Sequence, residues 1–496
     1  MAKVLLIQPP LSKTELFARG SESSASIIPP LGLAYLAAYL KAQGHACSIV
    51  DGIAQPQPIS ELVNISKSYD VAGITVVSAF ALRALELVQA IKSADGTPPV
   101  VVGGPHVTAL PQTMLYSGAD LAVIGEGEQT LLDLVEWLGG NKDRNILRAI
   151  PGVGYINEGK YVFTGARPKI DPLDRVPLPD RTLLPMQLYR SSIARASTQP
   201  SHSLLTSRGC PGLCTFCSKL TFGTNVRYFS TDRIIEEFFL LRDRYGARDV
   251  AVWDDNFVSN HDVALAVCDG LRSRKFDRTW SVEARIDGVD RQVLTNLKAS
   301  GCTYIAYGIE SGNQRILDYI NKRTTKDQIR DVVAMTREVG IPMRGYFMFG
   351  FPGESLAEME DTLRFAIELN LEIASFTLCI PLPGTREYLR ACKSGAFDPE
   401  YFLHRITPEF NFPDAPIYVP EGLTAGQLLE FHRHAYSRYY FRWSVIRKRI
   451  VSLRSSGEAR DLLLGAYTLA TNAFRKSRTS HGTGAAADRP TGDTPA

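Results

Sequence analysis

The chain has 496 residues, of which 45% are hydrophobic and 22% are charged. These are ordinary values for a soluble globular protein, and the length predicts two or three domains. The 55 basic and 52 acidic residues give a net charge of +3, which provides no electrostatic argument for a nucleic-acid partner, and none is expected. Eight cysteines are too few for a disulfide scaffold, no secretory signal opens the chain, and no apolar run reaches the roughly 18–20 residues of a membrane-spanning helix. We therefore expect a cytoplasmic protein.

Residues 1–145 alternate short apolar runs with helical patterns, which predicts βαβ units on a parallel, Rossmann-like (flavodoxin-like) sheet. The predicted strands are 4–8, 47–50, 71–77, 99–102 and 121–124. In such a sheet ligands bind at the carboxyl ends of the strands. Those ends are polar and rich in glycine, and they contain Gln8, Asp51, Ser78, Gly103, Gly104, Gly125 and Glu126. From the residues alone, this edge is either a nucleotide-like or cofactor site or a set of turn glycines without a ligand.

Residues 146–200 are predicted to connect this domain to the next. Residues 155–163 are predicted to form a hairpin around Asn157-Glu158-Gly159. The Pro-rich segment 171–185 that follows has no helical periodicity and is predicted to be extended, wrapping one domain onto the other.

Three cysteines lie within eight residues, at C-x3-C-x2-C spacing: Cys210, Cys214 and Cys217. The glycines and proline among them exclude a helix there. Three thiolates on one tight loop suit a [4Fe–4S] cluster, which normally takes four, so that one iron stays open to an outside ligand. A zinc site generally needs a fourth Cys or His at short spacing, and none lies nearby. A disulfide loop is a weaker alternative still.

From residue 203 the strand–helix pattern returns, with six predicted units. The strands are 203–208, 249–253, 279–284, 303–308, 343–349 and 373–379, and the helices lie near 231–245, 261–274, 290–299, 326–339 and 356–369. Six units are too few for an eight-fold barrel, but function should still gather at the strand ends. The polar residues at those ends are Asp254, Asp255, Asn256, Glu283, Arg285, Glu310, Ser311 and Arg344. The alternatives are a helix cap around Asn260 and structural pairing of Glu283 and Arg285.

The cysteine stretch, including the aromatic Phe216, resembles the signature of the radical S-adenosylmethionine (SAM) enzymes. In that family SAM chelates the open iron, and reduction of the cluster cleaves it to a 5′-deoxyadenosyl radical. The resemblance implies a partial (β/α)6 barrel of the TIM type over residues 201–420, with Phe216 beside the cofactor. It also implies that 254–256 receive the SAM amino group, that Glu283 and Arg285 contact ribose and carboxylate, and that 308–312, with Glu310 and Ser311, contact adenosine. Arg344 opens a further recurrent family segment.

The segments 29–36, 102–106 and 124–128 resemble the cobalamin-binding domain that precedes many radical SAM cores. The resemblance implies cobalamin bound at the polar strand ends of residues 1–145. Cobalamin carriers that ligate cobalt use Asp-x-His-x-x-Gly, whereas Asp51 is followed here by Gly52-Ile53-Ala54. We therefore expect base-off cobalamin without a histidine ligand, and His106 is interpreted as a loop residue.

Together the two modules imply a cobalamin-dependent radical SAM enzyme, with methylation of an unactivated carbon as the leading prediction. Relatives with this layout also perform cyclisation or rearrangement, which is the alternative reaction. A non-catalytic corrinoid or iron–sulfur carrier, and a radical SAM enzyme whose first domain has lost cobalamin, are further alternatives. The expected partners are a small-molecule, lipid or natural-product substrate and an external electron donor of the flavodoxin or ferredoxin type.

The C-terminal part is predicted to be helical over 421–475, followed by a disordered tail at 476–496. Residues 428–454 are basic with interleaved aromatic residues, typical either of a helix that touches anionic membrane or of one packed over the barrel with a solvated basic face. The histidines there, His432 and His434, are interpreted as packing or surface residues. Cys379, at the end of the last predicted strand, is either an active-site thiol or a core residue.

Overall fold

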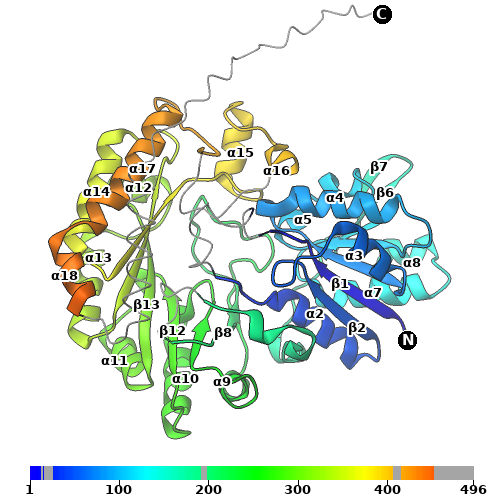
Figure 1. The fold of residues 1–496 in the computed structure, drawn as a ribbon, viewed down its shortest axis with the longest axis horizontal. Coiled ribbons are helices and arrows are strands. Elements are labelled where there is room, and N and C mark those ends of the chain that lie inside the picture. Colours follow the sequence, from blue (N-terminus) through cyan, green and yellow to red (C-terminus); the bar gives the residue numbers. More distant parts are fainter. Residues whose placement is uncertain (13–14, 16–25, 192–197, 406–414, 452–496) are drawn as a thin grey trace, which may run out of the picture.

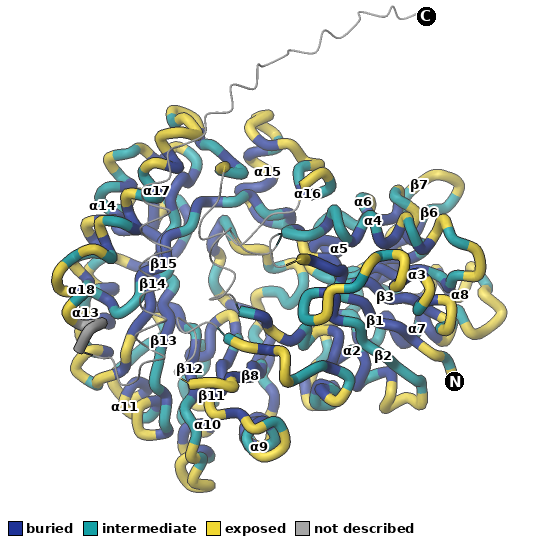
Figure 2. Tube along the Cα trace, viewed as in Figure 1, coloured by how far each residue is buried: buried dark blue, intermediate teal, exposed yellow. Residues whose placement is uncertain are grey.

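The protein is described by a computed structural model that covers all residues except 13–14, 16–25, 192–197, 406–414 and 452–496. Two α/β units lie side by side, the first in blue and cyan and the second in green to orange (Figure 1). Most strands of both units are buried, whereas β7 is partly exposed (Figure 2). The predicted tail, and the part of the predicted helical region beyond Val451, lie outside the described residues.

The first sheet has seven strands in the order β2-β1-β3-β4-β5-β6-β7. Its strands are β1 (Lys3–Gln8), β2 (Ala46–Asp51), β3 (Val71–Thr75), β4 (Val100–Gly103), β5 (Leu121–Val123), β6 (Val153–Asn157) and β7 (Lys160–Phe163). The first five are parallel, as predicted, and β6 and β7 continue the sheet in antiparallel pairing. The hairpin assigned to the connector is therefore part of this sheet, which runs to Phe163 and not only to residue 145. Pairing of Ala122 with Gly154 covers the edge of β5.

Successive residues of β1 point to opposite faces of the sheet, each covered by helices. Val4 and Leu6 pack in a core with α2 (Leu31–Ala42) and α7 (Glu128–Gly139). Leu5 and Ile7 pack on the other side. The helices there are α3 (Ile59–Ser66), α4 (Ala81–Lys92), α5 (Pro105–Ala109) and α6 (Pro111–Leu115); α8 (Arg144–Ala149) precedes the hairpin. Parallel strands covered on both faces explain the nearly continuous apolar runs of the sequence.

The second sheet has six parallel strands in the order β8-β11-β12-β13-β14-β15. They are β8 (Ser201–Leu204), β11 (Asp249–Val252), β12 (Thr279–Ala284), β13 (Cys302–Glu310), β14 (Met343–Phe349) and β15 (Ile373–Leu378). The following helices are α9 (Thr231–Tyr245), α10 (His261–Ser273), α11 (Arg291–Ala299), α13 (Lys326–Val339), α14 (Leu356–Leu369) and α15 (Arg386–Lys393). This is the partial barrel expected. The six-residue α12 (Gln314–Tyr319) was not predicted, because so short a helix shows no clear period.

The open edge of β15 is covered by α17 (Ala425–Tyr440). The Tyr436 hydroxyl donates to the Phe376 carbonyl at 3.0 Å and accepts from its N–H at 3.2 Å, and Tyr440 does the same at Ala374. His432, which is buried, lies 3.0 Å from the same Phe376 carbonyl. These side chains take the place of a neighbouring strand. The packed-helix interpretation of residues 428–454 therefore holds for α17, while His434 is exposed.

The basic segment is two helices and not one, because α17 ends at Tyr440 and α18 (Trp443–Val451) follows. Trp443 is 73% exposed. Within the described ranges, every helix is too short or too polar to cross a membrane. Cys379 is buried in the barrel core and burial raises the pKa of its thiol well above its usual value, which supports the packing interpretation of this cysteine.

Candidate active site between the two domains

The cysteine loop is held between two short paired strands, β9 (Ser207–Arg208) and β10 (Arg227–Tyr228). Gly209 has φ +101°, and a Cβ there would lie 2.6 Å from the Asn225 carbonyl oxygen, so only glycine can begin the loop. Cys210 and Cys214 are buried and Cys217 is exposed, and all three thiols are free. In the part of the chain that the structure describes, no three His, Cys, Asp or Glu side chains are arranged so that they could hold a single metal ion. The donor set is three thiols at a partly open loop, which fits a cluster with one free iron better than a closed zinc site.

Arg285 contacts this loop directly. Its Nη1 donates to the Cys214 Sγ at 3.3 Å, while Nε and Nη2 bind the Asp287 carboxylate at 2.8 and 2.7 Å. Nη2 also donates to the Lys322 carbonyl at 2.7 Å. A Cβ on Gly212 would lie 2.8 Å from the Arg285 Nη1, so this glycine makes room for the guanidinium. The ribose or carboxylate contact expected of Arg285 is thus replaced by a charged hydrogen bond to a cluster thiol, a contact known to stabilise thiolate.

Loss of this bond should lower the reduction potential of the cluster. Reduction adds negative charge, so a hydrogen bond from a cation to the ligating sulfur stabilises the reduced state. If the hydrogen bond stabilises the reduced cluster by about 1 kcal/mol more than the oxidised cluster, the midpoint potential rises by roughly 40 mV for one electron. We expect Arg285→Met to shift the midpoint downward by that order in a titration followed by electron paramagnetic resonance. The exposed Arg291→Met serves as control, and equal midpoints in all three proteins would contradict the assignment.

A second buried ion pair lies beside the loop. The Lys322 Nζ donates to the Glu310 Oε1 at 2.9 Å, and both side chains are nearly inaccessible. Burial alone would lower the pKa of Lys322, but the Glu310 carboxylate outweighs it and raises this pKa. Glu310 has φ +69°, in the left-handed region that residues other than glycine rarely adopt. The carboxylate expected to meet adenosine is therefore already paired with an ammonium.

Asp254 anchors the segment that leads into the cysteines. Its buried carboxylate accepts from the Thr206 and Ser207 N–H groups at 2.7 and 3.3 Å, from the Ser207 hydroxyl at 2.6 Å and from the Thr206 hydroxyl. Burial raises the pKa of Asp254 to about 6 although these bonds oppose the shift. The expected contact with the SAM amino group is replaced by protein donors, whereas the adjacent Asp255 is exposed.

Asn256 and Ser311 are also bound within the protein. The Asn256 Oδ1 accepts from the Arg285 N–H at 3.0 Å, and the Ser311 hydroxyl lies 2.9 Å from the Thr362 hydroxyl. Buried polar groups need such partners. The Asn256 Oδ1 and the Ser311 hydroxyl are therefore already engaged within the protein.

The face of the second sheet that points away from the helices is polar. Tyr346 donates to the Glu283 Oε1 at 3.0 Å, and the Arg344 Nε donates to the Ser375 hydroxyl at 3.0 Å. The Arg344 Nη1 and the Tyr304 hydroxyl are buried without a hydrogen-bond partner among the described residues. Glu283 and Arg344 thus lie on one lumen face. Glu283 lies at the carboxyl end of β12, as predicted, but Arg344 is the second residue of β14 and lies at its amino end, so its predicted place at a carboxyl strand end was wrong. The aromatic Phe216 packs against Phe351 at 5.8 Å between ring centroids.

Glu354 directly precedes the cap residue of α14, but its carboxylate binds elsewhere. Its buried Oε2 accepts from the Gly350 and Phe351 N–H groups at 2.6 and 3.0 Å, and Oε1 has no hydrogen-bond partner. Burial raises its pKa to about 8. The cap of α14 is Ser355.

The Glu354 shift predicts a pH dependence of stability. Because the folded state holds the proton more tightly than the unfolded state, the free energy of unfolding should fall as pH rises from 4.5 to about 8, by up to about 1.4 kcal/mol per unit. Urea unfolding at pH 6 and 8 should show this slope in wild type and a reduced slope in Glu354→Gln. Glu358→Gln is the control, since a hydrogen bond from Arg315 lowers the pKa of Glu358 to about 2. An identical slope in Glu354→Gln would contradict the assignment.

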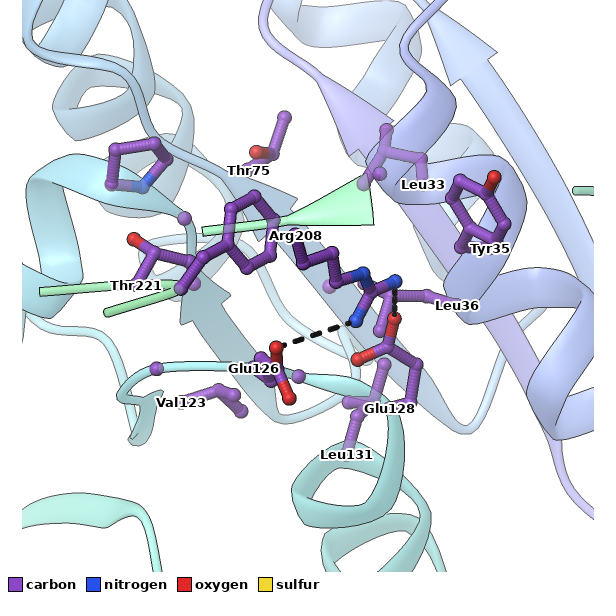
Figure 3. A pocket seen from close by; sticks show the side chains of 18 of the residues that line it. Leu33, Tyr35, Leu36, Thr75, Val123, Glu126, Glu128, Leu131, Arg208 and Thr221 are labelled. Carbon is purple, nitrogen blue, oxygen red and sulfur yellow. Dashed lines mark hydrogen bonds and ion pairs between the residues drawn. The ribbon is translucent and has the colours of Figure 1, made fainter. Parts of the chain in front are cut away.

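A cavity of about 430 Å³ lies where the carboxyl ends of the first sheet meet the cysteine loop (Figure 3). Its deep part lies between the sheet and the α2 and α7 helices and is apolar, lined by Leu6, Leu33, Leu36, Val101, Val123 and Leu131. Gly103, Gly104 and Gly125 line it from the strand ends. A Cβ at Gly125 would meet no atom within 4 Å, so the absence of a side chain there leaves space for a ligand. The second domain contributes Arg208, Asp255 and the segment from Ser218 to Gly223.

Three of the residues predicted to bind cobalamin do not line the cavity. Asp51 accepts from the Tyr189 hydroxyl at 2.8 Å, and Ser78 lies 3.0 Å from the His106 Nδ1. Gln8 is absent from the cavity lining, as are Asp51 and Ser78. His106 lies in α5 and not in a loop as predicted; it is buried with both ring nitrogens in hydrogen bonds, and no histidine is found among the described residues around the cavity.

Glu126 lines the cavity, but its carboxylate belongs to an ion-pair network that joins the domains. Arg227 binds both its oxygens, and the Ile170 N–H donates to its Oε2 at 2.9 Å. Arg208 pairs with Glu128 at 2.5 Å. Sequence reasoning missed Arg208, although it lies only two residues before Cys210. The role of Arg208 depends on Glu126 and Glu128, which are distant in sequence, so no local pattern predicts it.

A three-thiol loop on a partial barrel, facing a cofactor-sized cavity in a Rossmann-like domain, defines an enzyme with two adjoining cofactor sites. The model of the Radical SAM superfamily matches residues 204–366, and that of the B12 binding domain matches residues 21–135. The uncharacterized methyltransferase PH0819 of Pyrococcus horikoshii is 33% identical over 453 residues, which are 90% of this chain and 94% of that protein. The chain belongs to the radical SAM enzymes that carry a B12-binding domain.

Two further similarities extend this comparison. The anaerobic magnesium-protoporphyrin IX monomethyl ester cyclase of Rubrivivax gelatinosus is 27% identical, over 85% of this chain and 75% of that protein. The radical S-adenosylmethionine methyltransferase TsrM of Kitasatospora setae, solved with cobalamin and a [4Fe–4S] cluster, superposes with a TM-score of 0.64. Its sequence is 20% identical, and the superposition covers 80% of this chain and 76% of that one, so it shows the shared fold.

The residues present fit the cofactors of this family. The free thiols of Cys210, Cys214 and Cys217 are the donors that would hold the [4Fe–4S] cluster, and Glu283 provides a polar group near the carboxyl strand ends, where SAM would bind. The apolar cavity with open glycine rims is suited to a corrinoid. The cofactor set expected from the sequence is confirmed by the family.

Proposed function

We propose that this enzyme methylates an unactivated carbon of a small molecule. The observation that carries the proposal is that the residues directly after Cys217, from Ser218 to Gly223, form part of the wall of the corrinoid cavity. One loop therefore serves both cofactor sites. Such closeness is what a reaction needs when a radical formed at one cofactor prepares a carbon that the other must alkylate.

When bound, the cluster with SAM supplies a carbon-centred radical and cobalamin supplies a methyl group. The chain itself binds and orients these groups. Cys210 and Cys214 are buried on the loop, and Arg285 adds a cation beside the Cys214 sulfur. Glu283, near the carboxyl end of β12, presents a carboxylate on the lumen face, where SAM would be oriented. The Arg208–Glu128 ion pair joins the two domains beside the cavity.

The proposal is tested with SAM carrying a labelled methyl group. After anaerobic reconstitution with iron, sulfide and cobalamin, we expect corrinoid absorption bands in the purified protein and label in the product. Absence of corrinoid bands would remove cobalamin from the account. Product without label would favour cyclisation or rearrangement, the alternative that the cyclase relative supports. A carrier without catalysis would turn over no SAM at all.

We infer that electrons come from an external donor of the flavodoxin or ferredoxin type, because the family requires reduction of the cluster.

The membrane contact considered for residues 428–454 has less support, since the tyrosines of α17 are hydrogen-bonded to the backbone of β15. Among the described Phe, Tyr and Trp residues of the segment 428–454, only Phe441 and Trp443 are exposed. If they bind lipid, Trp443→Ser should reduce co-sedimentation with anionic liposomes several-fold. Equal sedimentation of both proteins would remove membrane contact through this residue.

A further inference from the structure

Arg208 is a buried cation at the wall of the corrinoid cavity, and it comes from the barrel domain (Figure 3). Its side chain is 3% exposed. The Nη2 donates to the Glu128 Oε1 at 2.5 Å, and Nη1 lies 3.8 Å from the Glu126 Oε1. The guanidinium also lies 5.5 Å from the ring centroid of Tyr35 and 5.3 Å from that of Phe222. It is therefore held in place on several sides.

The Nε and Nη1 of Arg208 have no hydrogen-bond partner in the described structure. A guanidinium carries five N–H donors, and leaving buried donors unpaired is costly. Among the described residues, Arg208 contacts two rings and two carboxylates, and it also lines the cavity, where an acceptor of a bound ligand could lie. Unpaired donors of a rigidly held cation point to an oxygen acceptor on the ligand of this cavity.

We propose that Arg208 binds the nucleotide tail of the corrinoid, at its phosphodiester oxygens. This inference rests on the proposed function. The deep part of the cavity offers apolar walls such as Leu33 and Val123, which suit a flat aromatic base, while Arg208 and Lys219 are cations on the same cavity. The tail of cobalamin has this composition, with an apolar benzimidazole joined through an anionic phosphodiester to the ring. The ring amides also offer acceptor oxygens, and the experiment separates the two sources.

Arg208 is a binding residue of a particular kind, because it also begins the cluster loop. It lies in β9, with Gly209 between it and Cys210. One short segment thus holds the corrinoid tail at one end and the first cluster ligand at the other.

The test compares the affinities of the full-length, cluster-reconstituted protein for hydroxocobalamin and for cobinamide, which lacks the nucleotide tail. We measure them by absorption titration in wild type, Arg208→Gln, Arg208→Lys and Arg227→Gln. Arg227 is the matched control, since it binds Glu126 in the same network but does not line the cavity. Wild type should prefer cobalamin. Arg208→Gln should weaken cobalamin binding about 10- to 100-fold, Arg208→Lys less, and both should leave cobinamide binding unchanged. Arg227→Gln should change neither affinity.

Equal loss for both corrinoids in the Arg208 variants would assign the contact to the ring and overturn the proposal, as would unchanged cobalamin affinity. Should the Arg208 variants fail to fold, the wild-type protein still decides, because equal affinity for the two corrinoids would overturn the tail contact. Failure of wild type to bind either corrinoid would instead contradict the proposed function, so the two failures are distinguishable.

Discussion

Replacing Cys214 with alanine is expected to reduce SAM cleavage to the background of the enzyme-free reaction. A cluster bound by only two thiolates loses the ligand that Arg285 also contacts, and its reduced state loses that stabilisation. We expect the purified variant to lack the broad absorption of the [4Fe–4S] cluster after anaerobic reconstitution. Production of 5′-deoxyadenosine with dithionite is the activity to measure.

The control for this prediction is Cys392→Ala. Cys392 lies on α15 and its thiol is half-buried, away from the three-cysteine loop in sequence and in role. This variant should keep the cluster absorption and the cleavage rate. Retained cleavage in Cys214→Ala would refute the assignment of the cluster to this loop.

Asp254→Ala should destabilise the protein by about 2–4 kcal/mol, because it leaves the buried N–H groups of Thr206 and Ser207 without an acceptor. Since these residues lead directly into the cysteine loop, cluster content should fall as well. The measurements are denaturant unfolding and iron content per chain.

Asp255→Ala is the matched control, one residue away. Asp255 is exposed, so stability should change by less than about 0.5 kcal/mol and the cluster should be retained. If Asp254→Ala instead kept full stability and iron content but lost affinity for SAM, the anchoring role would be wrong and the role in binding the SAM amino group, expected from the sequence, would be restored.

The contrast between these two aspartates shows what the sequence could and could not predict. A buried strand followed by polar residues predicted a functional strand end, and the structure has that strand end at Val252. The partners of Asp254, however, lie 48 and 47 residues earlier in the chain, in a segment with no local signal that it would turn back toward them. Residue type and position could be predicted, but the pairing could not.

The same limit applies to the fold: the elements could be predicted, but their pairing could not. Five of the six barrel strands were predicted to within two residues at each end, because parallel strands covered by helices are continuous apolar runs. The first was predicted at 203–208, whereas β8 is Ser201–Leu204. The hairpin at Val153–Phe163 was found, but its place in the first sheet depends on pairing with β5, which local patterns do not encode. In α17 the tyrosines bond to backbone atoms of β15, and a basic aromatic helix looks the same in sequence whether it faces lipid or a strand edge.

The cluster loop carries the clearest sequence signal of the site, because its three cysteines are close in sequence and short spacing leaves few arrangements. Of the residues predicted on the corrinoid side, the three glycines and Glu126 line the cavity, and the Glu126 carboxylate is engaged by Arg227. Gly103, Gly104 and Gly125 line the cavity, whereas Asp51 and Ser78 bind within the protein. A glycine in a turn allows another group to come close to the backbone, and the local sequence predicts such a turn. The direction of a polar side chain depends on partners that are distant in sequence.

The central claim is that radical formation at the cysteine loop is coupled to methyl transfer from the adjoining corrinoid. The most direct measurement is the ratio of S-adenosylhomocysteine to 5′-deoxyadenosine formed per turnover with SAM, reductant and substrate. Methyl transfer to an unactivated carbon predicts about equal amounts, because one SAM supplies the radical and a second restores the methyl group. Deoxyadenosine formed with product but without S-adenosylhomocysteine would contradict methyl transfer.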